Sequence, residues 1–409
     1  MRRRLSAHGG GLPEIESCGP SCHPFGGIMN IFNRLADRFA KVTPLPEGMH
    51  HLQSESADKK PYRVHLRLRR DGSGLFIVNA ATVLHLNPTA AEYAYHFIKG
   101  TELAEAAKQI ASRYRVRKNI ALEDYQGFLD RIETLVTSQD VDPVSYLGFE
   151  RVSPHSADLP APLRLDCALT YRLPEDTQAE YAPVKRVDRE LTTDEWKSIL
   201  DTAWRMGVPH VTFTGGEPTL REDLPELIAH AEKNGQVCGL LSDGLKLADK
   251  DYRQLLLQTG LDHLLFLLQP ENERSWQALE AIMPDDLFVT VHITINKQIA
   301  TKITATLEKL AAHQVKSISF SLADLSLKNE LDAVTQRAAD LNIKVNFDLP
   351  VPYSAQNPVA LETEEDGVPT GAGKAWLYVE PDGDVLPAQG MAENVLGNLL
   401  EDNWESIYR

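Results

Sequence analysis

The residues best suited to chemistry form a short turn, Gly215-Gly216-Glu217-Pro218, between an apolar run and a segment with helical periodicity. Two consecutive glycines let a backbone approach a ligand closely, because neither carries a Cβ atom. The N–H and C=O groups of such a turn could bind an amino or a carboxylate group, and Glu217 could pair with an ammonium group. An ordinary turn between a strand and a helix fits the same residues, and their spacing does not decide between the two.

Two further candidates lie on segments in which polar and apolar residues alternate. His292 could act as an acid–base group or contact a ligand, but it could equally be a hydrogen-bonded interior histidine. Asp166 is a second acid–base candidate, and pairing with Arg164 is its alternative, since a buried ion pair needs no catalytic role.

The chain has 409 residues and only four cysteines, Cys18, Cys22, Cys167 and Cys238. Four scattered cysteines are not a disulfide framework, so we expect a reducing cytoplasm. Cys167 shares the apolar parity of its segment and Cys238 lies within a similar run, which predicts small buried hydrophobes. Cys18 and Cys22 precede His23 and could bind a metal, but they lie in a glycine-rich tail.

The net charge of −16 argues against binding to nucleic acid or to an anionic membrane, since both need a basic surface. No apolar run approaches the roughly 20 residues that span a bilayer. Arg63, Arg67 and Arg69 alternate with apolar residues, and they could form a solvated face or attract an acidic peptide. The first residues are rich in Gly, Pro and Ser, and translation could begin at Met29 rather than Met1.

Candidate strands and helices alternate through the centre of the chain. The strands are Leu163–Thr170, His210–Thr214, Val237–Leu241, His263–Leu268, Phe288–Ile295, Lys316–Leu322 and Lys344–Leu349. The helices are Thr192–Met206, Leu224–Asn234, Asp249–Thr259, Trp276–Ile282, Ala300–His313 and Leu327–Asn342. Repeated strand–helix units predict a parallel sheet. Several strands carry a polar face, which favours a partly open α/β barrel with a polar interior over a TIM barrel filled by bulky side chains.

The flanking regions have different patterns. Two strands, Tyr62–Arg69 and Leu75–Val78, followed by three helices predict a small winged-helix-like module, and a hairpin around Pro381–Asp384 is expected near the end. The predicted domains are a disordered or poorly structured segment at 1–60, the module at 61–136, a linker at 137–162, the barrel at 163–349 and a C-terminal extension at 350–409.

The turn after the second barrel strand resembles the Gly-Gly-Glu-Pro motif of the radical S-adenosylmethionine (radical SAM) superfamily, whose fold is a partial (βα)6 barrel of the TIM type. Ser242-Asp243-Gly244 is similar to the Thr-Asn-Gly turn of that family. The region from Trp376 resembles the SPASM extension, and residues 62–136 resemble the PqqD-like RiPP recognition element, which binds precursor peptides. The residues to which the resemblance assigns S-adenosylmethionine binding are Gly215, Gly216, Glu217, Pro218 and Ser242.

The chain departs from that family in the loop after the first barrel strand. Active members place three cysteines there, in the pattern Cys-x3-Cys-x2-Cys, and the thiolates hold a [4Fe–4S] cluster that cleaves S-adenosylmethionine. Here the three positions are Leu173, Thr177 and Glu180. A further SPASM cysteine position is Ala388, and no cysteine follows Cys238. We therefore expect no [4Fe–4S] cluster and no other metal.

The leading hypothesis from the sequence is a degenerate radical SAM-like protein, a pseudoenzyme, in a peptide-modification or cofactor-maturation pathway. It would bind a precursor peptide or a partner radical SAM protein, and its barrel would bind S-adenosylmethionine or nothing. Two alternatives stay open. One is a non-radical enzyme that uses His292, Asp166 or Glu217 in the barrel interior, and the other is an active radical SAM enzyme with an unusual iron–sulfur site.

Overall fold

The computed structural model describes residues 42–54, 62–78, 82–137, 159, 161–174, 181–323, 325–346, 351, 353–354 and 371–408. The chain divides into two compact units, Met1–Val42 and Thr43–Arg409, and every element named below belongs to the second. The predicted N-terminal tail and most of the predicted linker at 137–162 lie outside the described residues.

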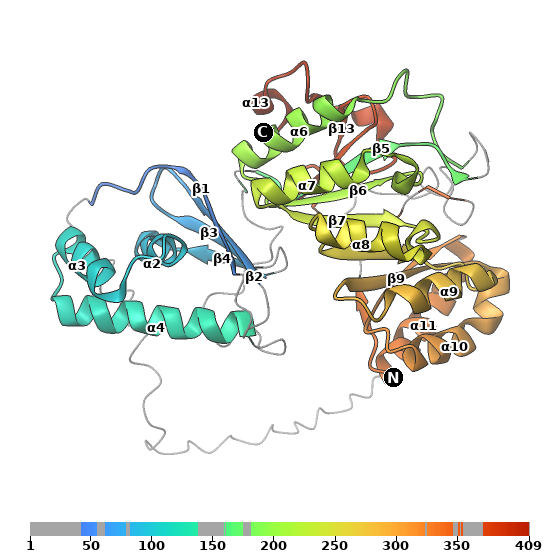
Figure 1. The fold of residues 1–409 in the computed structure, drawn as a ribbon, viewed down its shortest axis with the longest axis horizontal. Coiled ribbons are helices and arrows are strands. Elements are labelled where there is room, and N and C mark those ends of the chain that lie inside the picture. The colour runs from blue at the N-terminus through green and yellow to red at the C-terminus, as the bar shows by residue number, and fades with distance from the viewer. Residues whose placement is uncertain are drawn as a thin grey trace, which may run out of the picture. The chain divides into compact units, whose positions relative to one another are not determined.

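A ten-stranded sheet forms the centre of this unit (Figure 1). Its strand order is β11-β10-β9-β8-β7-β6-β5-β12-β13-β14, and all neighbours from β11 to β12 are parallel. The parallel strands are β5 (Arg164–Thr170), β6 (His210–Gly215), β7 (Val237–Ser242), β8 (His263–Leu267), β9 (Phe288–Ile295), β10 (Ser317–Leu322), β11 (Lys344–Asn346) and β12 (Trp376–Val379). The connecting helices are α6 (Thr193–Met206), α7 (Leu224–Asn234), α8 (Lys250–Gln258), α9 (Glu273–Ile282), α10 (Lys297–Ala312) and α11 (Lys328–Asp340). The expected fold class, a partial TIM-type barrel, is confirmed.

The strands of the barrel have one apolar and one polar face. Leu165, Cys167 and their counterparts on the other strands pack with helix residues in the main core. The opposite face is polar on several strands, as predicted, and its side chains are largely buried. Thr290 Oγ1 lies 2.8 Å from Ser317 Oγ, and Asn346 Nδ2 donates to the same oxygen over 2.5 Å. Cross-strand hydrogen bonds of this kind satisfy the polar groups of the interior.

A smaller antiparallel sheet, in the order β1-β2-β3-β4, precedes three helices. These elements are β1 (Gly48–Ser54), β2 (Tyr62–Leu68), β3 (Gly74–Val78), β4 (Thr82–Leu86), α2 (Pro88–Ile98), α3 (Leu103–Tyr114) and α4 (Lys118–Thr137). The expectation of two strands is incomplete, and the expectation that residues 48–54 are poorly structured is wrong. β1 has no apolar alternation to reveal it. Backbone pairing with β2 holds it, together with an edge-on contact between the rings of His51 and Trp204.

Both faces of this four-stranded sheet are covered. Phe76 on β3 meets Phe97 of α2 with ring centroids 6.5 Å apart. On the other face of β3, Leu75 and Ile77 pack with Trp376, the first residue of β12. The sheet therefore lies between its own helices and the barrel, and the polar side chains of His65 and Arg67 on β2 are buried.

The polar side chains of β2 contact the ends of two barrel helices. Gly207 caps the C-terminus of α6 and Gly235 caps that of α7, both with left-handed φ, a common geometry at helix C-termini. Arg67 donates to the carbonyl oxygen of Gly207, and His65 Nε2 lies 2.6 Å from that of Gly235. Helix C-termini carry a partial negative charge that favours cations. From the sequence, Arg67 was expected to lie on a solvated face or to attract an acidic peptide. Both expectations are wrong, because Arg67 is buried against the barrel. Arg63 pairs with barrel carboxylates beside it.

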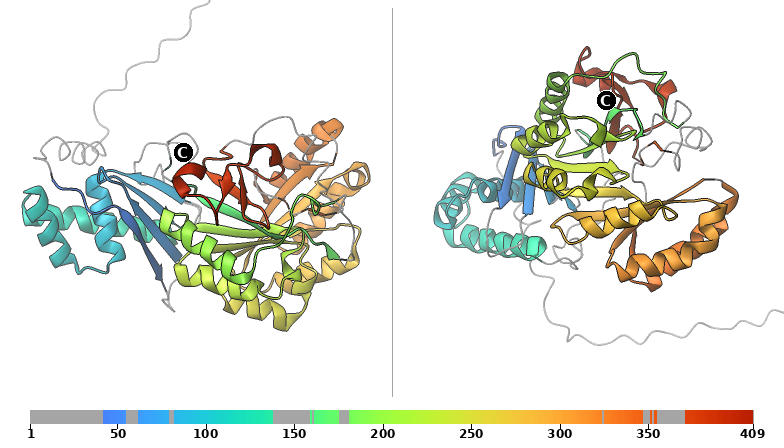
Figure 2. Two further views of the ribbon diagram at one scale, coloured as in Figure 1. Left: turned by 90° about the horizontal axis from the view of Figure 1, so that it is seen from above. Right: turned by 45° about the vertical axis from the view of Figure 1, so that its right-hand side comes forward.

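The C-terminal region extends the barrel sheet (Figure 2). β12 lies parallel beside β5, and β13 (Asp384–Leu386) and β14 (Gly397–Asn398) continue the sheet in antiparallel fashion. The expected hairpin is present, and a short helix, α13 (Trp404–Ile407), follows it. In the part of the chain that the structure describes, no helix has the length and apolar character needed to cross a membrane.

Candidate functional site

The turn Gly215–Pro218 lies against the end of β5. Gly215 has φ +123°, and a Cβ atom on it would lie 2.1 Å from the carbonyl oxygen of Thr170. A Cβ atom on Gly216 would lie 2.3 Å from the carbonyl oxygen of Arg172. Both glycines are therefore required because two segments of backbone approach each other closely.

The N–H groups of this turn already donate within the chain. The N–H of Gly216 donates to the carbonyl oxygen of Thr170 over 2.7 Å, and the N–H of Glu217 donates to that of Arg172 over 2.9 Å. These bonds join the ends of β5 and β6. They leave fewer backbone donors for a ligand than the sequence suggests.

Glu217 is buried and accepts hydrogen bonds from three neighbours. Its Oε1 accepts from the hydroxyl groups of Thr219 (2.6 Å) and Ser242 (2.8 Å), and its Oε2 accepts from the N–H of Asp243 (3.0 Å). Burial, and then the charge of Asp243, raise the pKa of Glu217 to about 8. Burial also raises the pKa of Asp243. Adjacent carboxyl groups titrate as a unit, so this pair retains a proton near neutral pH.

The structure thus brings two predicted site residues, Glu217 and Ser242, into contact at the carboxyl ends of β6 and β7. Active sites of parallel α/β barrels lie at that end of the strands. Pro218 begins a short 3-10 helix, Pro218–Leu220, directly beside them. Because donors of the chain itself occupy the carboxylate of Glu217, binding of S-adenosylmethionine by this turn stays a prediction.

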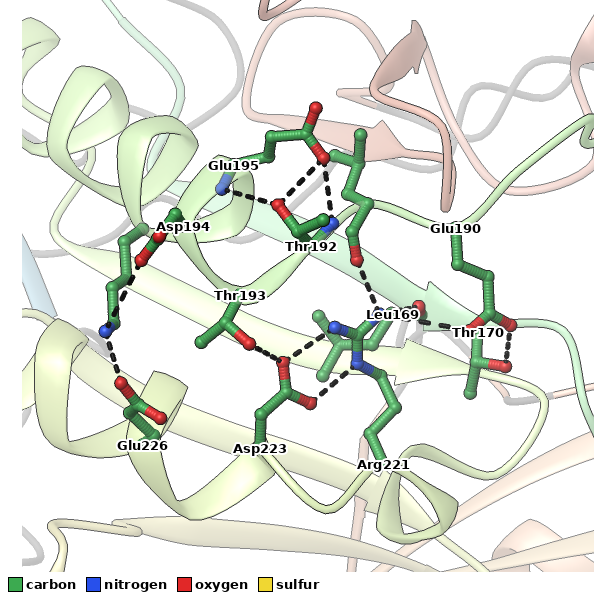
Figure 3. Close-up of polar contacts among 12 residues, drawn as sticks. Leu169, Thr170, Glu190, Thr192, Thr193, Asp194, Glu195, Arg221, Asp223 and Glu226 are labelled. Atoms are coloured by element: carbon green, nitrogen blue, oxygen red, sulfur yellow. Dashed lines mark hydrogen bonds and ion pairs between the residues drawn. The ribbon is translucent and has the colours of Figure 1, made fainter.

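Arg221, which the sequence did not single out, is buried beside the turn (Figure 3). Its Nη1 donates to the carbonyl oxygens of Leu169 (3.1 Å) and Leu191 (2.9 Å), and its Nε donates to Asp223 over 2.8 Å. Arg221 therefore fastens the end of β5 to the segment that leads into α6. An arginine two residues before an aspartate, just after the glycine turn, is the signal that could have identified it.

The loop after β5 is anchored in a group of tyrosines. Leu173, the first of the expected cysteine positions, packs against a buried group that includes Tyr171, Tyr353 and Tyr378, and we call these four residues the tyrosine cluster. The rings of Tyr171 and Tyr353 meet edge-on with centroids 5.5 Å apart. The N–H of Tyr353 donates to the carbonyl oxygen of Gly215 over 2.8 Å, so the cluster directly adjoins the glycine turn.

A buried ion pair completes the tyrosine cluster. Glu380 accepts from the hydroxyl group of Tyr171 over 2.7 Å and from Arg186 Nε over 2.8 Å. Burial raises the pKa of Glu380, although its bonds to Tyr171 and Arg186 oppose this. Leu173 and Arg186 lie on either side of residues 175–180, so both described sides of the loop are fixed to the same cluster.

The described residues do not offer a ligand set for a [4Fe–4S] cluster. Cys167 and Cys238 are buried in the apolar core, and burial raises the pKa of both thiols well above the usual value. Iron is ligated by thiolates rather than thiols. Within the described ranges, no group of three or more His, Cys, Asp or Glu residues could hold a metal ion. Thr177, Glu180 and the N-terminal cysteines lie outside those ranges, so the absence of a cluster stays a prediction.

His292 and Asp166 lie on the polar inner face with partners in place. His292 Nδ1 lies 2.7 Å from Ser319 Oγ, and its Nε2 lies 3.0 Å from Ser321 Oγ. Burial lowers the pKa of His292 to about 3, so the ring is neutral near pH 7. Asp166 accepts hydrogen bonds from Arg164 over 2.8 and 3.0 Å. These contacts favour the structural interpretation of both residues.

The candidate site thus lies in a partial barrel of parallel strands, with a Gly-Gly-Glu-Pro turn after its second strand. Residues 167–341 match the family model described as the Radical SAM superfamily. The matched span begins within β5 and ends just after α11, so it covers most of the parallel barrel.

Proteins similar to this chain include PqqA peptide cyclases. The chain is 26% identical over 264 residues to the PqqA peptide cyclase of Bradyrhizobium diazoefficiens, covering 58% of this chain and 68% of that protein. It is 26% identical over 289 residues to the PqqA peptide cyclase of Xanthomonas oryzae pv. oryzae, covering 60% of this chain and 75% of that one.

Solved structures similar to this one include SuiB of Streptococcus suis. The structure of SuiB bound to S-adenosylmethionine has a TM-score of 0.57 at 17% identity, over 84% of this chain and 86% of SuiB. SuiB bound to its precursor peptide SuiA has the same TM-score of 0.57 at 16% identity, over 88% and 89% of the two chains. At such low identity, these likenesses establish the fold alone.

Proposed function

We propose that this chain is a degenerate radical SAM protein, a pseudoenzyme of a peptide-modification pathway in the cytoplasm. It binds a precursor peptide or a partner radical SAM protein, and it does not itself perform radical chemistry. Its barrel binds S-adenosylmethionine or no cofactor. The observation that carries the proposal is the tyrosine cluster, which contains the first position at which the family has a cluster-binding cysteine.

The tyrosine cluster supports the loss of radical chemistry. Cleavage of S-adenosylmethionine by this family needs a [4Fe–4S] cluster held by three thiolates. Leu173 is instead packed against the buried group that contains these tyrosines, and Arg186 further along the loop is bonded to Glu380. An iron–sulfur cluster at this place would require the packed side chains to move and thiolates to come from outside the described residues.

Similar proteins named as peptide cyclases, and SuiB in complex with its precursor peptide, support a peptide as the binding partner. In the four-stranded sheet, β4 is an edge strand, and among the described residues only β3 pairs with it. An extended peptide can add to such an edge through backbone hydrogen bonds, with alternate side chains on the two faces of the sheet. We place the peptide along β4.

Anaerobic reconstitution of the full chain with iron and sulfide tests the loss of radical chemistry. We expect iron well below one cluster per chain, no broad visible absorption of a [4Fe–4S] cluster, and no cleavage of S-adenosylmethionine. A cysteine-complete radical SAM protein treated in parallel is the control. A stoichiometric cluster that cleaves S-adenosylmethionine would refute the proposal.

Hydrogen exchange tests where a peptide binds. The probe is a peptide selected on the full chain from a random display library. Its addition should slow exchange of the edge amide groups in Thr82–Leu86 and leave those in Lys344–Asn346, at the end of the barrel sheet, unchanged. Protection of β11 without protection of β4 would contradict the placement.

A further inference from the structure

Arg69, which directly follows β2, differs from the two arginines within that strand. Arg63 and Arg67 contact the barrel, whereas Arg69 Nε and Nη2 are buried and have no hydrogen-bond partner. These two N–H groups form the fork that binds both oxygens of a carboxylate at once. Buried donors without an acceptor are rare in folded proteins, and each calls for an explanation.

A second unpartnered group lies on the same face of the sheet, on the edge strand β4. Arg67 is opposite Leu75, and Leu75 is opposite His85, so these three side chains share one face. Arg69 follows Arg67 by two residues and continues that face. His85 Nε2 is also buried without a hydrogen-bond partner. After burial, the charge of Arg69 is what lowers the pKa of His85, which places the two groups within electrostatic reach.

The surroundings of Arg69 favour a negatively charged occupant. The nearby carboxylate of Asp71 is engaged by Ser73, whose N–H and hydroxyl group donate to Asp71 Oδ1 over 2.9 and 2.6 Å. Arg67 adds a second positive charge close by. Residues 62–137 contain 11 Lys and Arg against 8 Asp and Glu, in a chain that has 42 and 58 in total. The module is therefore a basic part of an acidic protein, and it would attract an acidic segment.

We propose that Arg69 and His85 form a carboxylate-binding site beside the free edge of β4, which takes an Asp or Glu side chain of the added peptide strand. This inference rests on the proposed binding of a peptide along β4. When a strand pairs with β4, its alternate side chains lie beside Val83 and His85 on this face. Arg69 Nε and Nη2 donate to the two carboxylate oxygens, and His85 donates a third hydrogen bond when its proton is on Nε2.

Selection from a random peptide display library on the full chain tests the site. The wild-type chain should enrich extended segments with Asp or Glu at one fixed position, by about tenfold or more over Asn and Gln. Arg69→Met should abolish that preference, and Arg69→Lys, which keeps the charge but lacks the fork, should weaken it. Arg70→Met is the matched control, because Arg70 is adjacent, exposed and paired with Glu47. The preference of this variant for acidic peptides should equal that of the wild type.

The outcomes distinguish failure of the carboxylate site from failure of peptide binding along β4. Arg69→Met removes two unpartnered buried donors, so its thermal midpoint should be unchanged or higher, which separates lost binding from misfolding. If the enriched peptides have no fixed acidic position, the carboxylate site is refuted, but binding of a peptide along β4 is not. An acidic preference that persists in Arg69→Met would overturn the site as well. If no peptide is enriched on the folded wild-type chain, both the site and the edge are refuted.

Discussion

Arg67 of β2 donates to the carbonyl oxygen of Gly207, the residue that ends α6. The same guanidinium group donates to the carbonyl oxygens of Ala161 (3.0 Å) and Pro162 (3.3 Å). One buried side chain thus joins the four-stranded sheet to the barrel by satisfying three backbone acceptors. The partial negative charge of a helix C-terminus adds to this attraction.

Replacing Arg67 with Met should lower the free energy of unfolding by roughly 3 kcal/mol, because three buried carbonyl groups lose their donor. Urea denaturation of the full chain measures this loss. Arg70→Met serves as the control, since Arg70 is exposed, and we expect no measurable change in that variant. Equal stability of the two variants would show that the Arg67 contacts do not hold the sheet on the barrel.

Gly215→Ala should destabilise the chain by about 3 kcal/mol or more. The φ angle of Gly215 is unfavourable for alanine, and the added Cβ atom would clash with the backbone of a neighbouring strand. That Cβ atom would lie 2.1 Å from the carbonyl oxygen of Thr170. Gly127 of α4 has open space around its Cβ position. Gly127→Ala is therefore the matched control and should stabilise the helix by roughly 0.5–1 kcal/mol. Thermal denaturation of both variants checks the contrast, and a tolerated alanine at 215 would contradict the packing of the turn.

Glu217 should make the chain less stable as pH rises from about 4.5 to about 8. Its pKa is about 8 in the folded chain against an ordinary value of 4.5. In this window the folded carboxyl group keeps a proton that the unfolded one has lost, so rising pH favours unfolding.

Denaturation at several pH values across that window measures the slope. Glu217→Gln should flatten it, because the amide does not titrate. Glu222→Gln changes an exposed glutamate nearby and should leave the slope as in the wild type. The same slope in all three chains would contradict a raised pKa for Glu217.

Tyr171→Phe should reduce stability by about 1–2 kcal/mol, because buried Glu380 loses one of its donors and keeps Arg186. Tyr252 has a buried hydroxyl group without a hydrogen-bond partner, so Tyr252→Phe should be neutral or slightly stabilising. Chemical denaturation compares the two. Unchanged stability in Tyr171→Phe would mean that the ion pair between Arg186 and Glu380, not the tyrosine hydroxyl, holds the cluster.

The barrel could be predicted because its strands carry a period of two and its helices carry caps. Thr192 begins α6 with the expected bonds to Glu195, and the polar face of β9 contains His292 as expected. β1 and β4 were not predicted because they lack such clear signals. β1 carries neighbouring histidines, His50 and His51, instead of an apolar alternation, and β4 is short and follows β3 closely.

The contacts that shape the candidate site could not be predicted from local patterns. Arg67 and Arg221 bind backbone carbonyl oxygens, which every residue carries, so no residue type reveals the partner. Tyr171 and Glu380 are 209 positions apart. The Gly-Gly-Glu-Pro turn was recognisable because its residues resemble a family motif, but the bonds from its N–H groups to Thr170 and Arg172 were not.

The position of β12 beside β5 has a consequence for biosynthesis. Ribosomes add roughly 5–20 residues per second, so Trp376–Val379 leaves the exit tunnel some tens of seconds after β5. Until then the edge of β5 that pairs with β12 is unsatisfied, which invites mispairing with other chains. Translation stalled before Trp376 should therefore yield polypeptides that depend on chaperones to stay unaggregated.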